Sequence, residues 1–138
     1  MHISLCVLNT KTLELNYSGA NNPIYIIHQI DNAETELIEV KADKFPVGAF
    51  VDEQVQSFTS KKLQLQKNAL VYLFSDGFAD QFGGDKGKKF KYKQLKDILL
   101  ENQNLSLAKQ YSVLEERFTN WKGKLEQVDD VLVIGIRV

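Results

Sequence analysis

Apolar and polar residues alternate along the first part of the chain, with the period of two that is typical of half-buried strands. The alternation is clearest over residues 3–7 and 13–17, and residues 9–12 between them have turn composition. These ranges therefore predict a hairpin. Further strands are expected at residues 24–30 and 36–40, with short strands at 55–59 and 62–66.

In the second part of the chain the apolar period becomes helical. Residues 92–99 place apolar side chains on one helical face, and the polar residues 102–104 break this helix. A second amphipathic helix follows, with Asn104 or Ser106 as its N-cap and Gly123 at its end. We expect its apolar stripe to lie in the core, and the stripe consists of Leu107, Tyr111, Leu114, Phe118 and Trp121.

A final strand, residues 128–138, follows the helices. Many strands, then two helices and one last strand predict an α+β fold, with a mostly antiparallel sheet and helices packed on one face. The length of 138 residues is that of one domain, and no linker or repeat divides the sequence. We therefore expect a single domain over residues 1–138.

The most apolar strand of the chain, residues 70–74, is followed at once by Ser75, Asp76 and Gly77. Its unbroken apolar run, rich in Val, Tyr and Phe, is typical of a strand buried on both faces. The sequence thus places a carboxylate at the end of a buried strand, next to a glycine that can turn the chain.

A pair of carboxylates, Asp129 and Asp130, directly precedes the apolar residues 131–136. If this segment pairs antiparallel with residues 70–74, Asp76 and Asp129 meet at one edge of the sheet. Neighbouring carboxylates repel unless a cation lies between them, and hard divalent cations such as Mg²⁺ or Mn²⁺ prefer oxygen ligands. The alternative is structural, because aspartates are common in turns and at strand ends.

Composition mainly excludes function classes. A formal net charge of −1 gives no overall electrostatic case for binding nucleic acid or an anionic membrane. No apolar run approaches the roughly 20 residues that span a bilayer, and no signal peptide is visible. The single cysteine, Cys6, excludes an internal disulfide and is expected to be a small core residue. We therefore expect a cytoplasmic protein.

A glycine- and lysine-rich stretch, residues 83–93, separates the central strand from the first helix. Its lysines could steer a phosphorylated or acidic partner, but the composition is also that of a solvated, mobile loop. The spacing is not that of a phosphate-binding P-loop, and the chain has no G-x-S-x-G nucleophile elbow. The lysines are Lys86, Lys88, Lys89, Lys91 and Lys93.

Four motifs occur in order along the chain: GANNP (residues 19–23), PVG (46–48), YLFSDGFADQFGG (72–84) and QVDDVLVIGI (127–136). Together they resemble the SpoIIE/RsbU-type serine phosphatases, which belong to the metal-dependent protein phosphatase (PPM) superfamily. The resemblance covers essentially the whole chain. Its most specific part is the combination of a Ser-Asp-Gly strand end with an Asp-Asp strand start.

The resemblance implies an α-β-β-α sandwich, in which two antiparallel sheets are flanked by helices and the centre holds two Mn²⁺ or Mg²⁺ ions. It also implies that a metal-bridging water attacks the phosphorus of a phosphoserine or phosphothreonine. By motif, Asp76 and Asp129 would be metal ligands and Asp130 a neighbour behind them. The other residues implied to lie near the site are Gly77, Gly19, Asn21 and Asn22.

Family members carry further metal-binding aspartates upstream, in an Asp-x-x-Gly-His-Gly-like segment before the strand that here begins at His2. We therefore expect the chain to be the C-terminal portion of a phosphatase domain, incomplete at its N-terminus and catalytically incomplete. Missing strands would leave sheet edges unpaired, which favours a homodimer through those edges. The usual partner in this branch is a phosphorylated STAS-domain protein, an anti-anti-sigma factor, and a sensor module often precedes the phosphatase domain.

Three functions follow from these observations as alternatives. The first is a metal-dependent serine/threonine protein phosphatase domain acting on a phosphorylated signalling regulator. The second is a non-catalytic, phosphatase-like interaction module in a bacterial signalling system. The third is an unrelated hydrolase that uses the same carboxylates.

Overall fold

The computed structural model describes residues 1–30, 34–48 and 57–138. The strands of its two larger sheets are β1 (Ile3–Asn9), β2 (Glu14–Ala20), β3 (Ile24–Gln29), β4 (Thr35–Val40), β5 (Lys61–Gln64), β6 (Leu70–Phe74) and β9 (Val133–Arg137). The remaining elements are helices α1 (Gly77–Asp80), α2 (Lys91–Glu101) and α3 (Leu107–Lys122) and the small strands β7 (Phe82–Gly83) and β8 (Lys88–Lys89).

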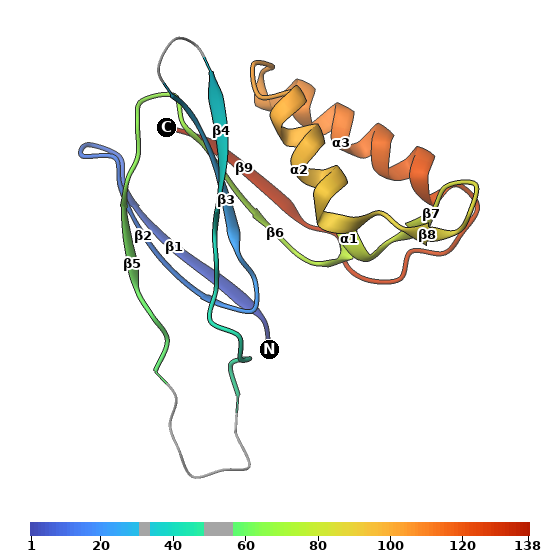
Figure 1. The fold of residues 1–138 in the computed structure, drawn as a ribbon, viewed down its shortest axis with the longest axis horizontal. Helices are drawn as coiled ribbons and strands as arrows, with labels where there is room; N and C mark the ends of the chain where they lie inside the picture. Colours follow the sequence, from blue (N-terminus) through green and yellow to red (C-terminus); the bar gives the residue numbers. More distant parts are fainter. Residues whose placement is uncertain (31–33, 49–56) are drawn as a thin grey trace.

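The two larger sheets are antiparallel, and α2 and α3 lie beside one of them (Figure 1). This arrangement confirms the predicted α+β fold with antiparallel sheets and flanking helices. In the described part of the chain only one helical layer is present, so three of the four layers of an α-β-β-α sandwich are formed.

The smaller of these sheets has the strand order β1-β2-β5. β1 and β2 form the predicted hairpin, with a register that runs from Ile3 opposite Ala20 to Asn9 opposite Glu14. Along β1 the side chains alternate between outward and inward positions, so Cys6 is half-buried and packs against the core between the sheets. Burial raises the pKa of its thiol above the ordinary value.

The short strands expected at 55–59 and 62–66 are only partly correct. Residues 55 and 56 lie outside the described residues, and residues 57–59 form no strand. Thr59 instead donates its backbone N–H and its hydroxyl to the carboxylate of Asp43, at 2.7 and 3.1 Å. A side chain therefore takes the hydrogen bond that a neighbouring strand would have accepted, and the strand β5 covers only residues 61–64.

The larger sheet has the order β4-β3-β6-β9, so the predicted buried strand β6 lies between two neighbours. Ile24 of β3 pairs with Leu73, and Val133 of β9 pairs with Phe74. The last strand is shorter than expected, because it covers residues 133–137 rather than 128–138.

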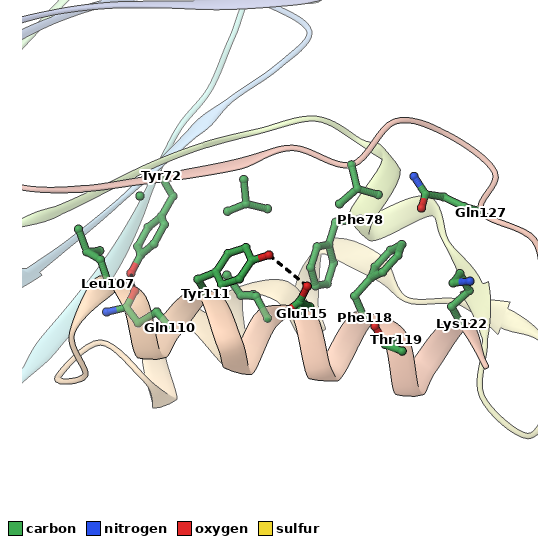
Figure 2. Close-up of a pocket in the computed structure, with 14 residues that line it drawn as sticks. Tyr72, Phe78, Leu107, Gln110, Tyr111, Glu115, Phe118, Thr119, Lys122 and Gln127 are labelled. Atoms are coloured by element: carbon green, nitrogen blue, oxygen red, sulfur yellow. Dashed lines mark hydrogen bonds between the residues drawn. The ribbon is translucent and has the colours of Figure 1, made fainter.

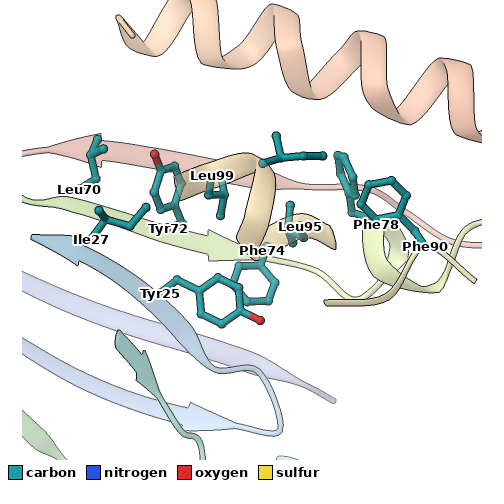
Figure 3. Close-up of a cluster of buried hydrophobic side chains, with 10 residues drawn as sticks. Tyr25, Ile27, Leu70, Tyr72, Phe74, Phe78, Phe90, Leu95 and Leu99 are labelled. Carbon is teal, nitrogen blue, oxygen red and sulfur yellow. The ribbon is translucent and has the colours of Figure 1, made fainter. Parts of the chain in front are cut away.

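Two apolar clusters hold these layers together. The cluster between the two sheets consists of Leu15, Tyr17, Ile24, Ile26, Val40, Leu65, Ala69 and Val71. The cluster between the larger sheet and the helices is shown in Figure 3 and consists of Tyr25, Ile27, Leu70, Tyr72, Phe74, Phe78, Phe90, Leu95, Ile98 and Leu99. Since β6 contributes alternate residues to both clusters, it is the strand on which the two layers of the core are assembled.

The helices follow the predicted limits but not every predicted face. Ser106 caps α3 by accepting a hydrogen bond from Lys109 N–H, and Gly123 ends it with φ = 54°. The prediction that Tyr111 lies in the core is wrong, because its side chain is 64% exposed. No helix in the part of the chain that the structure describes is long and apolar enough to cross a membrane.

Tyr111 is exposed because α3 does not close against β9 along its whole length. A groove of about 550 Å³ remains between them, lined on the helix by Leu107, Tyr111, Leu114 and Phe118 (Figure 2). The helix is attached at one end of this groove by a buried hydrogen bond of 2.6 Å from the Tyr72 hydroxyl to Gln110 Oε1.

As the described strands pair, β1 and β5 are the edges of the smaller sheet, and β4 and β9 are the edges of the larger one. Of these edge strands, β1 and β9 expose several apolar side chains, which is unusual for a finished sheet edge. The exposed residues of these edges are Ile3, Leu5 and Val7 on β1, with Leu132, Ile134 and Ile136 at β9.

The Tyr72–Gln110 hydrogen bond gives a test of how α3 is held. Replacing Tyr72 by Phe leaves the buried side-chain oxygen of Gln110, Oε1, without this donor. We therefore expect the free energy of unfolding to fall by about 1–2 kcal/mol. The matched control is Tyr111→Phe, which removes an exposed hydrogen bond to Glu115 and should change stability by less than about 0.5 kcal/mol. Urea denaturation measures both, and equal losses would contradict this role for Tyr72.

Candidate metal centre

The pairing of β6 with β9 brings the Ser-Asp-Gly and Asp-Asp segments together. Ser75 N–H donates to the carbonyl of Leu132 at 3.0 Å. The Ser75 hydroxyl donates to the carbonyl of Asp130 at 2.7 Å and accepts from Leu132 N–H at 2.9 Å. This side chain replaces regular ladder hydrogen bonds, which explains why β9 begins only at residue 133.

Gly77 allows the two segments to approach closely. A Cβ atom at this position would lie 2.4 Å from the Asp130 carbonyl oxygen and 3.3 Å from the Asp129 carbonyl carbon. No real side chain tolerates such a distance, so only glycine fits here without moving the backbone. The first residue of α1 is therefore packed directly on the Asp-Asp peptide.

Asp76 lies between these two contacts, at the N-terminus of the short helix α1. It is partly buried, and its carboxylate makes no capping hydrogen bond to the helix. Asp129 and Asp130 are exposed, and Asp129 Oδ1 accepts the Asp130 N–H at 2.7 Å. The backbone thus places three aspartates at the same end of the larger sheet, as the sequence predicted.

One residue near this end, Tyr92, was missed from the sequence. Tyr92 of α2 packs against Phe74, the last residue of β6, with ring centroids 6.1 Å apart. Burial and the nearby charges of Asp76 and Asp80 raise the pKa of the Tyr92 hydroxyl. Sequence periodicity assigned Tyr92 only to the packed face of its helix, and no motif indicated that it lies beside an acidic site.

The GANNP loop reaches the same end of the sheet, because Ile24 pairs with Leu73 and the loop directly precedes it. The loop is held by hydrogen bonds to its backbone groups. The Asn22 carbonyl accepts hydrogen bonds from the hydroxyls of Ser4 and Tyr17, both at 2.7 Å. Asn21 has φ = 60°, and its N–H donates to the Asp43 carbonyl at 2.8 Å.

Gly19 also belongs to the frame of this loop, since its carbonyl accepts from Asp43 N–H at 3.0 Å. Among the described residues, no hydrogen bond joins Gly19, Asn21 or Asn22 to Asp76 or Asp129. A role for these three residues near a metal therefore stays a prediction.

The donor chemistry of this end of the sheet suits a hard divalent cation, because it consists of carboxylate and carbonyl oxygens. The number of side-chain ligands is small. Within residues 1–30, 34–48 and 57–138, no three His, Cys, Asp or Glu side chains converge closely enough to hold a metal ion. The residues present fit one side of a metal site, and they do not close it.

Comparison with known proteins shows the family of the chain. The family model for stage II sporulation protein E (SpoIIE) matches residues 1–138. The chain belongs to the SpoIIE family. SpoIIE and its relatives are PP2C-type phosphatases, so the SpoIIE-type reading of the motifs is confirmed at the level of the family. Among curated proteins, none is similar enough in sequence to count as a relative.

Solved structures confirm the fold. The SiaA-PP2C domain of Pseudomonas aeruginosa superposes with a TM-score of 0.84 at 23% identity, over 99% of this chain and 51% of that one. The phosphatase domain of the cell fate determinant SpoIIE from Bacillus subtilis superposes with a TM-score of 0.62 at 14% identity, over 99% and 57%. A form of that domain presoaked with Mn gives 0.64 at 15% identity, over 100% and 56%. The chain thus spans about half the length of these SpoIIE-like domains.

Gly77→Ala tests the close approach at the site. Helix propensity alone favours alanine in α1 by up to about 1 kcal/mol. We expect the opposite sign, a loss of about 1–3 kcal/mol, because the new Cβ overlaps the Asp130 carbonyl. Thermal and urea unfolding measure the change, with the exposed α3 variant Ser112→Ala as the control. A neutral or stabilised Gly77→Ala protein would show that the two segments are not in contact.

Proposed function

We propose that this chain is the C-terminal portion of a metal-dependent serine/threonine protein phosphatase domain. The observation that carries the proposal is the contact between the Ser-Asp-Gly end of β6 and the Asp-Asp segment before β9. In a SpoIIE-family chain, this contact brings carboxylates together next to Gly77, at the point where β6 ends and the segment that leads into β9 passes it.

Each residue of the contact has a distinct role in this proposal. Asp76 and Asp129 supply carboxylate oxygens to Mn²⁺ or Mg²⁺, two ions in the complete domain, and Asp130 lies behind them. Ser75 and Gly77 fix the distance between the two segments. A bound divalent cation would activate water and offset the negative charge of the transferred phosphoryl group.

The complete site needs ligands that the described residues do not provide. The chain aligns with about half of each solved relative, and its free edges β1 and β9 carry exposed apolar residues. We propose that the remainder of the phosphatase domain covers these edges and contributes the missing aspartates. A second copy of this chain is the alternative occupant, and a homodimer would then form through the same edges.

We propose a phosphorylated STAS-domain protein, of the anti-anti-sigma type, as the substrate of the complete domain. A non-catalytic interaction module is the second candidate. One specific observation favours it, namely that no three metal-binding side chains converge in the part of the chain that the structure describes.

Metal binding by the chain separates these candidates. We expect calorimetric titration to detect weak Mn²⁺ binding, and Asp76→Asn or Asp129→Asn to weaken it by about tenfold or more, since each removes a charged ligand of similar shape. The control is Asp85→Asn, an exposed aspartate on the β7–β8 hairpin, which should leave binding unchanged. Equal affinity in all four proteins would rule out Asp76 and Asp129 as ligands.

Activity is tested in a protein that contains the whole domain. We expect Mn²⁺-dependent hydrolysis of a phosphoserine peptide, lost in both Asp76→Asn and Asp129→Asn. Binding of a STAS-domain partner without turnover in the unmutated protein would favour the interaction module instead.

A further inference from the structure

A basic surface lies beside the candidate metal centre. Residues 86–93 contain five lysines and no acidic residue, in a chain whose net charge is −1. All five lysines are exposed, and of these five only Lys89 has an ion-pair partner among the described residues, namely Asp80 at 3.0 Å. The other four charges are therefore not neutralised by a described carboxylate. We call these four residues the basic rim: Lys86, Lys88, Lys91 and Lys93.

The hairpin that carries the rim is tied to the rest of the fold. Gly83 lies against the end of α3, where a Cβ atom would be only 1.9 Å from the Trp121 carbonyl oxygen. Gly84 N–H donates to the same carbonyl at 2.8 Å, and Phe90 N–H donates to the Gln81 carbonyl at 2.9 Å. These contacts therefore do not support the alternative of a solvated, mobile loop. A surface held in place loses less conformational entropy when a partner binds.

The rim is also positioned next to the aspartates. Tyr92 lies between Lys91 and Lys93 in the sequence, and its ring packs on Phe74 with centroids 6.1 Å apart. Phe74 is the last residue of β6, and Asp76 follows two residues later. The start of α2, with its two lysines, therefore lies beside the strand end that carries Asp76.

Lys91 occupies an unfavourable backbone conformation at this point. Its φ is 74°, in the left-handed region that residues other than glycine rarely adopt. The lysine side chain is not needed for packing, because it is exposed. A charged residue kept at a strained, exposed position beside a site is a reason to look for a function.

We infer that the basic rim docks acidic residues that flank the phosphorylated side chain of a protein substrate. The inference rests on the proposed phosphatase function and adds the substrate class that this face of the site accepts. Lysines suit this task because each is a mobile point charge that pairs with a carboxylate without demanding one geometry. They also raise the encounter rate with an acidic partner.

The charge pattern favours an acidic peptide over a nucleic acid. Asp80 pairs with Lys89 within this stretch, and the charges of Asp76 and Asp80 lie near Tyr92. A continuous phosphate backbone crossing the lysines and these aspartates would meet repulsion at the aspartates. A peptide can place its carboxylates on the lysines and its single phosphate at the aspartates, where a cation compensates the charge.

The test uses this chain without metal, so that no turnover occurs. Fluorescence anisotropy follows binding of a labelled peptide with one serine flanked by Asp and Glu, and of a second peptide with Gln and Asn at those flanks. The serine is left unphosphorylated, so that no phosphate meets the aspartates without a cation. The rim variant is Lys91→Glu/Lys93→Glu, the two rim lysines at the start of α2. The matched control is Lys11→Glu/Lys67→Glu, since both lysines are exposed turn residues. The β1–β2 and β5–β6 turns that carry them lie far from β7–β8 and from the start of α2 (Figure 1).

We expect the acidic peptide to bind more tightly than the neutral one, and the rim variant to weaken its binding by about tenfold while the control changes it less than about twofold. Added salt should weaken binding to the unmutated chain more than to the rim variant. Equal binding of both peptides, no binding, or equal losses in the two variants would overturn the inference. Tighter binding of a single-stranded DNA oligonucleotide, lost in the rim variant, would overturn it in favour of nucleic acid.

These results are independent of the test of function. If Mn²⁺ binding or turnover fails while the rim result holds, the phosphatase proposal falls and the surface remains a docking site for acidic peptides. If metal binding and turnover hold while the rim variant binds normally, only the docking inference falls.

Discussion

The antiparallel pairing of β6 with β9 is the interaction on which the rest of the structure depends. It is the contact that brings Asp76 and Asp129 to one end of the sheet. Its register is set by burial on both faces of β6, because Tyr72 and Phe74 face the helices while Val71 faces the second sheet. A slip of one residue would exchange these faces, so the packing of the core also fixes the geometry of the site.

The contact also explains why small residues surround the aspartates. Ser75 links the two segments because a hydroxyl can donate to one backbone group and accept from another. Gly77 is needed because the two backbones touch at this point. A larger residue at either position would separate the aspartates without touching their carboxylates. The site therefore depends on two neighbours that have no charge of their own.

The sequence predicted those parts of the fold whose signals are local. The buried strand at 70–74 follows from an unbroken apolar run, and the ends of α3 follow from Ser106 and Gly123, which act within one helical turn. The meeting of Asp76 with the Asp129–Asp130 segment followed from a single assumption, that the two most apolar strands are neighbours.

Features that depend on distant contacts could not be predicted in this way. The β7–β8 hairpin packs through Gly83 against Trp121, which lies far along the chain. The lysine-rich composition of this stretch did not predict the hairpin. The exposure of Tyr111 has a similar cause. Its period places it on the apolar face of α3, but at this point a groove lies between the helix and β9.

The position of β9 at a sheet edge connects the site to the open surfaces of the molecule. β9 has a paired neighbour on one side only, a groove beneath α3 on one face, and the exposed side chains of Ile134 and Ile136 on the other. Any segment that pairs with its free edge would cover these apolar surfaces and would also pass the end at which Asp129 lies. Burial of apolar area would then stabilise the same arrangement that adds ligands to the metal centre, so that folding of the complete domain and metal binding would be coupled.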